Sequence, residues 1–262
     1  MKLIRGYILE EKEKILQSVR QLMKVYHAGL LGGEKMPEHE NPGLSKDSKE
    51  NYLYFTLPMA LNYQRNSYVL WECANKLYRE VPRMFDCGTV ISMPEKELRE
   101  TLVQYKVALQ PNKQPEIWKT LCNTFGERFD GDVRKFFWDR ELKAAAVKDY
   151  IRENKKSFPY LGGNKICNYW LYVMEQYTDA KFSDREQITV APDTHVIQAS
   201  TKLGVITAEE EKSADVQRKL AERWCELLKG TEWDPIDVHT PMWLWSRGKF
   251  AVDIMQDINS KF

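Results

Sequence analysis

The stretch Phe158-Pro159-Tyr160-Leu161-Gly162-Gly163-Asn164-Lys165 decides the predicted fold. It joins a strongly helical sequence over residues 141–154 to a second helical pattern over residues 166–177. The two glycines can adopt positive φ and let a ligand approach the backbone, so they predict a tight turn between two helices. A helix that opens on a lysine directs free backbone N–H groups, its positive dipole end and an amine toward one spot. This combination suits a phosphate-bearing substrate.

Helical periodicity dominates the remainder of the chain. Ser67 is a candidate N-cap, the pairs Ser92/Glu95 and Thr207/Glu210 fit capping boxes, and Gly230 is a stop signal. Only residues 187–190 alternate like a strand, which is too short for a sheet, and residues 29–49 form a polar stretch that we expect to be a loop. We therefore predict an all-α fold. The expected helices cover residues 9–26, 51–65 with an interruption near Pro58, 67–77, 95–105, 141–154, 166–177, 194–203, 207–230 and 240–259.

Composition narrows the classes of protein. The 262 residues are 43% hydrophobic, enough for a sizeable core, and the net charge of +1 excludes a uniformly basic nucleic-acid coat. The five cysteines are widely spaced and odd in number, so neither a disulfide framework nor a metal cluster is indicated, and we expect no cofactor and no metal. Without an apolar signal core or a membrane-spanning run, we expect a cytoplasmic, nucleoid-associated protein and no membrane partner.

Two ionisable residues stand out in this pattern. Asp193 lies in Val190-Ala191-Pro192-Asp193-Thr194-His195-Val196, where we expect it to N-cap a helix. A carboxylate at a helix start can also face an active site, because the dipole favours its charge. Lys165 is either a surface cation or a nucleophile, and the second role requires burial or neighbouring cations such as Lys155 and Lys156 to lower its pKa.

Several aromatic residues and one histidine fall near these segments. Most such aromatics pack in cores, but a few could sandwich a planar base that an enzyme extrudes from a helix. His239 precedes Trp243 by about one helical turn, so the two would share a face, although a lone histidine is more often structural. The aromatics in question are Trp71, Tyr169, Trp170, Trp243 and Trp245.

At these residues the chain resembles the helix–hairpin–helix DNA glycosylase superfamily. The resemblance rests on the 161–165 hairpin that ends in a lysine, on Pro192-Asp193-Thr194-His195-Val196, and on the tryptophan-containing segment 239–247. Within that superfamily it looks most like the archaeal-type 8-oxoguanine DNA glycosylases, because Lys165 and Asp193 are widely separated. The pattern of residues 57–63 followed by Trp71 is also similar to that branch.

The resemblance implies a fold and a reaction. Two helical subdomains would flank a cleft and carry a helix–hairpin–helix element. A monomer would bind double-stranded DNA with a damaged base, excise 8-oxoguanine through a Schiff base on Lys165 with help from Asp193, and cleave the strand as a lyase. By the family's pattern the base pocket would contain Trp71, Tyr169, His239 and Trp243. The expected DNA-binding residues are Lys155, Lys156, Leu161, Gly162, Gly163, Asn164 and Arg247.

The chain also departs from that family's pattern. The glycines of the hairpin are shifted relative to the usual motif, and His239 stands where the archaeal-type pattern has an aspartate. An imidazole cannot supply the same fixed acceptor charge. Two alternatives therefore stay open: a nucleoside N-glycosidase of the queuosine-salvage type, and a non-catalytic DNA-binding helical protein. We expect one subdomain to comprise residues 1–66 and 191–262, and a central subdomain to comprise residues 67–190.

Overall fold

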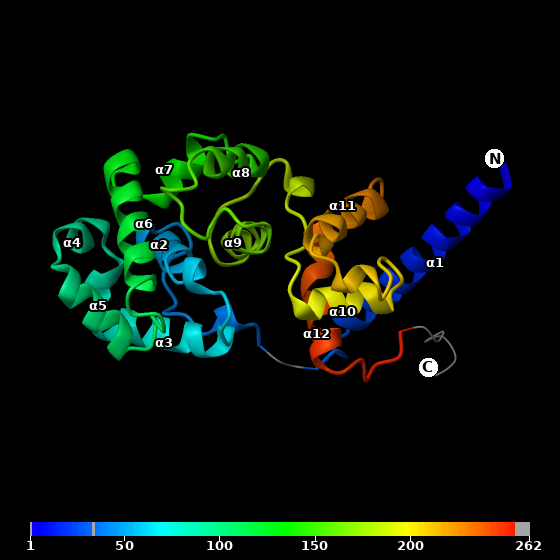
Figure 1. Ribbon diagram of the computed structural model, residues 1–262, viewed down its shortest axis with the longest axis horizontal. Helices are drawn as coiled ribbons and strands as arrows, with labels where there is room; N and C mark the ends of the chain where they lie inside the picture. The colour runs from blue at the N-terminus through cyan, green and yellow to red at the C-terminus, as the bar shows by residue number, and fades with distance from the viewer. Residues whose placement is uncertain (1, 33–34, 255–262) are drawn as a thin grey trace. The chain divides into compact units, whose positions relative to one another are not determined.

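The computed structural model describes residues 2–32 and 35–254, and within these ranges every regular element is a helix (Figure 1). The all-α fold predicted from periodicity is therefore confirmed. Of residues 187–190, Gln187 ends the 3-10 helix η4 (Arg185–Gln187), and the other three residues form no strand. The expected end of the last helix, residues 255–259, lies outside the described residues.

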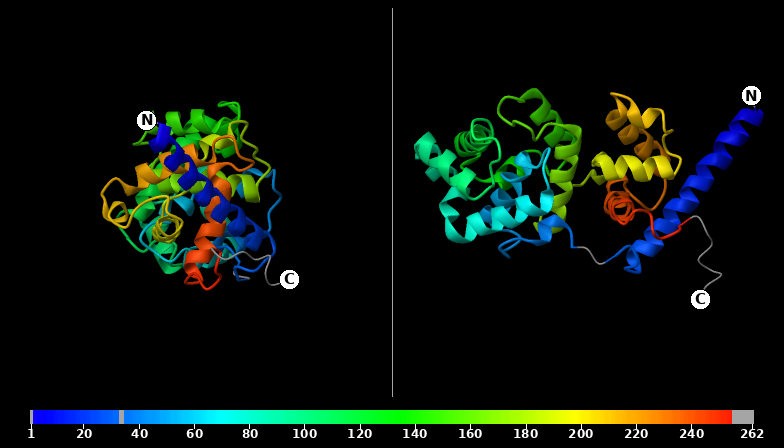
Figure 2. Two further views of the ribbon diagram at one scale, coloured as in Figure 1. Left: turned by 90° about the vertical axis from the view of Figure 1, so that its right-hand side faces the viewer. Right: turned by 60° about the horizontal axis from the view of Figure 1, so that its bottom comes forward.

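The chain divides into two compact units, each of which Figure 2 shows from two further sides. Unit 1 comprises residues 1–34 and 186–262, and unit 2 comprises residues 35–185. One unit is thus built from both chain ends, but residues 35–66, which we expected in that unit, belong to unit 2. The reason is packing, because the helix over residues 49–56 contacts the helix over residues 164–177 within unit 2.

Unit 1 is a small helical assembly around an aromatic core. Its α-helices are α1 (Lys2–His27), α10 (Thr194–Lys202), α11 (Val216–Leu228) and α12 (His239–Arg247). Helix α12 packs most extensively against α10 and also contacts α1 (Figure 1). At the centre, the fully buried Trp224 donates its indole N–H to Ser200 Oγ at 3.0 Å. These contacts fix the adjacent starts of α10 and α12, which carry the candidate residues of unit 1.

Unit 2 contains the remaining α-helices, and α9 runs through it next to α2. Its interior is strongly aromatic: Trp170 of α9 lies between Phe136 and Phe137 of α7 and donates its indole N–H to Thr56 of α2. The helices are α2 (Lys49–Thr56), α3 (Ser67–Glu80), α4 (Cys87–Ser92), α5 (Glu95–Gln104), α6 (Gln114–Phe129), α7 (Val133–Trp138), α8 (Ala144–Glu153) and α9 (Asn164–Tyr177).

Several helix starts differ from the predicted ones. Helix α3 is capped by Asn66, whose side chain accepts from the Tyr68 amide, and not by Ser67. Helix α5 has no side-chain cap, because Ser92 instead donates to carbonyl groups of the preceding helix. The Thr207/Glu210 capping box is present, but it opens the short 3-10 helix η5 (Glu210–Lys212), with α11 starting later. Neighbouring polar residues can each cap the same helix start, and tertiary packing determines which of them does so.

Candidate functional site

Lys165 is the second residue of α9, one position after the helix begins. Its side chain is partly buried, and its amine forms no hydrogen bond or ion pair with the residues that the structure describes. Gly163 is the N-cap and offers no side chain, so the first N–H groups of α9 lack a side-chain acceptor. The Lys165 amine, which has no polar partner among the described residues, therefore lies in the first turn of α9, whose N–H groups have no side-chain cap.

The turn before Lys165 has a different geometry from the one expected of its glycines. Neither Gly162 nor Gly163 adopts a positive φ; Tyr160 does, with φ of 65°. Tyr160 is held there by stacking on Tyr63, with ring centroids 4.1 Å apart, and by Lys113, whose Nζ lies 4.9 Å from the Tyr160 ring. A bulky residue in the left-handed region stores strain, so these contacts are what maintain the turn.

The proposed DNA-binding residues of the turn fall into two groups. Gly162, Gly163 and Asn164 are exposed, whereas Leu161 is fully buried and can offer only its backbone. Lys155 and Lys156 are also exposed. Arg152, a further cation of this region, is ion-paired with Asp149. Lys155 and Lys156 therefore supply exposed positive charge near the turn, in addition to the exposed Lys113 that contacts Tyr160.

Asp193 is the N-cap of α10, as predicted, and both of its carboxylate oxygens are engaged. Oδ1 accepts from the Val196 amide at 2.9 Å, and Oδ2 accepts from the Trp243 indole at 3.1 Å. The cap and the indole together fix the orientation of the carboxylate. The N–H of Trp243 is directed to Asp193, and the expected contact of Trp243 with a base stays a prediction.

Trp243 is itself held by its neighbours in unit 1. The Arg247 guanidinium lies 5.0 Å from its ring, and the His195 ring meets it edge-on at 5.6 Å. His195 Nδ1 is 3.2 Å from Ser246 Oγ, which donates to Gln198 at 2.9 Å. The sequence pattern contained His195 but assigned it no role. The clue in the sequence was its position two residues after the predicted N-cap Asp193, which keeps His195 close to that residue.

His239 opens α12 and is buried. Its Nδ1 accepts a long hydrogen bond, 3.4 Å, from the Ala191 amide. An Nδ1 that accepts leaves the proton of a neutral imidazole on Nε2. In that tautomer, Nε2 of His239 is a hydrogen-bond donor.

In unit 2 the expected pocket residues Trp71 and Tyr169 gather around a residue that the sequence did not indicate, Glu38. The Tyr169 hydroxyl donates to Glu38 Oε2 at 2.9 Å. Glu38 is 1% exposed, and burial raises its pKa from an ordinary 4.5 to about 7. The Trp71 ring is fully buried and contacts the tilted rings of Tyr54 and Phe55, at 5.7 and 5.6 Å between centroids.

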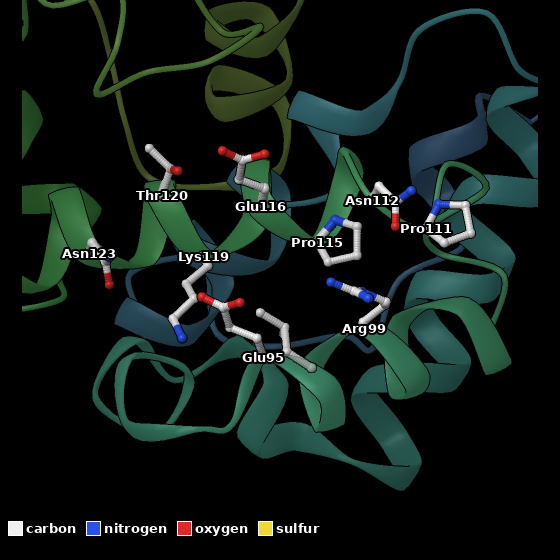
Figure 3. A pocket seen from close by; sticks show the side chains of 10 residues that line it. Glu95, Arg99, Pro111, Asn112, Pro115, Glu116, Lys119, Thr120 and Asn123 are labelled. Atoms are coloured by element: carbon white, nitrogen blue, oxygen red, sulfur yellow. The ribbon is translucent and has the colours of Figure 1, made fainter.

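A cavity of about 380 Å³ lies elsewhere in unit 2, between α5 and α6. Figure 3 shows Lys119 of α6 extending toward α5 in this cavity; its Nζ donates to the Met93 carbonyl at 3.3 Å. Its lining mixes exposed carboxylates and cations and includes none of the candidate residues. The cavity and the predicted site residues therefore lie in different places.

The candidates thus form two groups, one in each unit. Asp193, Trp243, Arg247 and His239 belong to unit 1, and Lys165, Tyr169 and Trp71 belong to unit 2. The meeting of Lys165 with Asp193 stays a prediction. In residues 2–32 and 35–254, no helix is both long and apolar enough to cross a membrane, and no group of three or more His, Cys, Asp or Glu is arranged to hold a metal ion.

Comparisons with known proteins add no assignment. No protein-family model matches the chain, and no curated protein matches it.

Proposed function

We propose that this protein is a DNA glycosylase with lyase activity that excises an oxidised purine, 8-oxoguanine, from double-stranded DNA. The observation that carries the proposal is the hydrogen bond from Trp243 to Asp193. The resemblance assigns these two residues, which are 50 positions apart, to one site, and an acid held at two points is what charge stabilisation requires.

The chemistry needs an amine and a carboxylate. Lys165 Nζ attacks C1′ of the everted nucleotide, the bond from C1′ to the base breaks, and the base leaves with the bonding electron pair. Asp193 stabilises the positive charge that develops on the sugar as the base departs. Loss of the amine proton and opening of the sugar ring give a Schiff base, from which β-elimination breaks the C3′–O3′ bond. Positioning supplies much of the rate.

Recognition of the duplex would rest on the turn before α9. The uncapped amides of that helix and the exposed Lys155 and Lys156 can contact phosphates. Few cations are involved, so binding should have a shallow salt dependence. Arg247 of unit 1, which is exposed and lies over the Trp243 ring, stays a further predicted DNA contact.

Borohydride trapping tests the proposal. The wild-type protein is incubated with a duplex that contains 8-oxoguanine, and a reduced covalent adduct is expected. Lys165→Gln should abolish the adduct, whereas Lys76→Gln, which removes an exposed lysine of α3, should retain it.

Other results would point elsewhere. Failure of the wild type to form any adduct on a panel of lesions would overturn the lyase. Release of a base from free nucleosides but not from duplexes would favour the nucleoside N-glycosidase. Salt-sensitive DNA binding without base release or strand cleavage would favour a binding protein.

A further inference from the structure

Two polar atoms in the interior of unit 2 are buried without a hydrogen-bond partner. They are Oε1 of Glu38 and Nε1 of Trp71. Glu38 is 1% exposed and Trp71 is 0% exposed, so neither atom reaches solvent. The indole N–H is close enough to lower the pKa of the Glu38 carboxyl, although the two form no hydrogen bond by distance and angle. An acceptor and a donor thus lie side by side and unsatisfied.

The pair has a fixed framework. Glu38 belongs to the 3-10 helix η1 (Pro37–His39), which packs on α3, the helix that carries Trp71. The Tyr169 hydroxyl holds the other carboxylate oxygen, and the Trp71 ring contacts Tyr54 and Phe55. These contacts orient the two unsatisfied atoms while η1 packs on α3. Unpaired buried polar atoms are costly, and a ligand that uses both removes that cost.

The cluster also stands beside the proposed nucleophile. Tyr169 follows Lys165 by four residues on α9, so the two side chains share one face of that helix. The hydrogen bond from Tyr169 to Glu38 therefore connects the face of α9 that carries Lys165 to the Glu38 carboxyl.

We propose that Glu38 and Trp71 read the lactam edge of a nucleobase, an N–H next to a C=O, with the base N–H donating to Glu38 Oε1 and the base carbonyl accepting from Trp71 Nε1. This inference rests on the proposed function and names the recognition group of that site. Guanine, hypoxanthine and 8-oxoguanine carry such an edge, whereas adenine presents an amino group next to a ring nitrogen. Entry of the base requires η1, only three residues long, to move away from α3.

Ionisation of Glu38 links recognition to pH. The carboxyl receives one donor from Tyr169, and a base N–H would add another, which favours the charged form. The groups that face Glu38 from the neighbouring elements are Tyr54 of α2, Trp71 of α3 and Tyr169 of α9. Because the pKa of Glu38 is raised to about 7, base binding should release a proton near neutral pH and strengthen as pH rises from 6 to 8.

Calorimetry with free nucleosides tests this without any catalytic step. The probes are 2′-deoxyinosine, 8-oxo-2′-deoxyguanosine and 2′-deoxyadenosine, titrated at pH 6 and pH 8. We expect the two lactam nucleosides to bind at least about 10-fold more tightly than 2′-deoxyadenosine. Glu38→Gln should weaken their binding about 10-fold and remove its pH dependence, and Trp71→Phe should weaken it without removing that dependence. Glu50→Gln, a change at an exposed carboxylate of α2, is the matched control.

The outcomes separate this inference from the proposed function. Equal affinity for the three nucleosides, no binding of any, or unchanged affinity in both variants would overturn the role of the pair. Where Glu38→Gln does not fold, Trp71→Phe decides. Lactam-selective binding with no borohydride adduct on DNA would remove the lyase and keep the recognition site, and an adduct that is indifferent to both substitutions would do the reverse.

Discussion

The two proposed reacting groups are held in opposite ways. In unit 1 the Asp193 carboxylate is fixed at both oxygens, by the Val196 amide and the Trp243 indole. In unit 2 the Lys165 amine has no polar partner among the described residues, and it stands behind a strained turn. The difference suits their proposed roles, because a stabilising charge works best when it is pre-oriented, whereas a nucleophile must be free to form a bond.

The same contrast extends to the surroundings of each group. Both Asp193 oxygens are hydrogen-bonded, and the indole that holds one of them contacts His195, which is hydrogen-bonded to Ser246. Around Tyr169, one turn from Lys165, the network ends in two unsatisfied buried atoms. A ligand gains the most binding free energy from hydrogen bonds to unsatisfied buried atoms, because these atoms are already desolvated. In the proposed mechanism, the oriented acid comes from unit 1, and the amine and the recognition pair come from unit 2.

The largest expected effect is that of Asp193→Asn. Asparagine caps a helix as well as aspartate does, so α10 should persist, but its single acceptor oxygen cannot serve both Val196 and Trp243. Loss of the charge should slow base release in single-turnover assays by about 10²- to 10⁴-fold. Asp86→Asn makes the same change at the N-cap of α4 and should leave the rate unaltered. A wild-type rate in Asp193→Asn would remove the acid from the mechanism.

The next effect concerns stability and pH in unit 2. The pKa of Glu38 is raised in the folded protein from 4.5 to about 7, so the folded state holds this proton more tightly than the unfolded chain does. The associated stability is fully present below pH 4.5 and is lost as pH rises through 7, a change of about 3 kcal/mol. Urea unfolding between pH 4.5 and 8 measures it.

Glu38→Gln provides the comparison for that measurement. The amide cannot ionise, so the variant should lack this part of the pH dependence. Exposed Glu50→Gln should follow the wild-type curve. Identical profiles for Glu38→Gln and the wild type would mean that Glu38 is solvated in solution and would weaken the proposed recognition site.

Local patterns in the sequence were sufficient for the helices but not for all of their boundaries. Apolar spacing predicted α9 within two residues, and proline before aspartate predicted the cap of α10. Helix α8 was expected from residue 141 but begins at Ala144, because the amides of its first turn are capped by Asp184, 40 residues later. A cap supplied from such a distance leaves no local trace.

The sequence predicted those parts of the candidate site that depend on a residue and its immediate neighbours, but not those that depend on tertiary contacts. Asp193 was identified from its neighbours in sequence, but its partner Trp243 lies 50 positions away and the hydrogen bond follows from the packing of α12 on α10. Glu38 was missed because it falls in a polar stretch that predicts a loop. Its burial comes from η1 packing on α3, a tertiary contact that composition does not reveal.

A smaller effect isolates the indole that orients Asp193. Trp243→Phe removes the N–H and keeps most of the ring, so it should cost about 1 kcal/mol of stability and slow base release about 10-fold. Trp245→Phe is the matched control on the same helix, since its N–H donates to the Val252 carbonyl at 2.8 Å. It should cost similar stability without slowing the reaction. Equal rates in the two variants would show that the carboxylate keeps its orientation without the indole.

The smallest effect probes the uncapped start of α9. Gly163 has the extended backbone of an N-cap, φ −75° and ψ 142°, so Gly163→Ser should cap the helix and add a few tenths of a kcal/mol of stability. The hydroxyl would then occupy an amide that a phosphate would otherwise use, and duplex affinity should fall a few-fold. Gly163→Ala adds a Cβ that meets only the Tyr160 carbonyl at 3.9 Å, so it separates the effect of bulk from that of the hydroxyl. If both variants bind duplex as the wild type does, the free amides of α9 do not contact phosphate, and exposed side chains near the turn, such as Lys155 and Lys156, must hold the DNA.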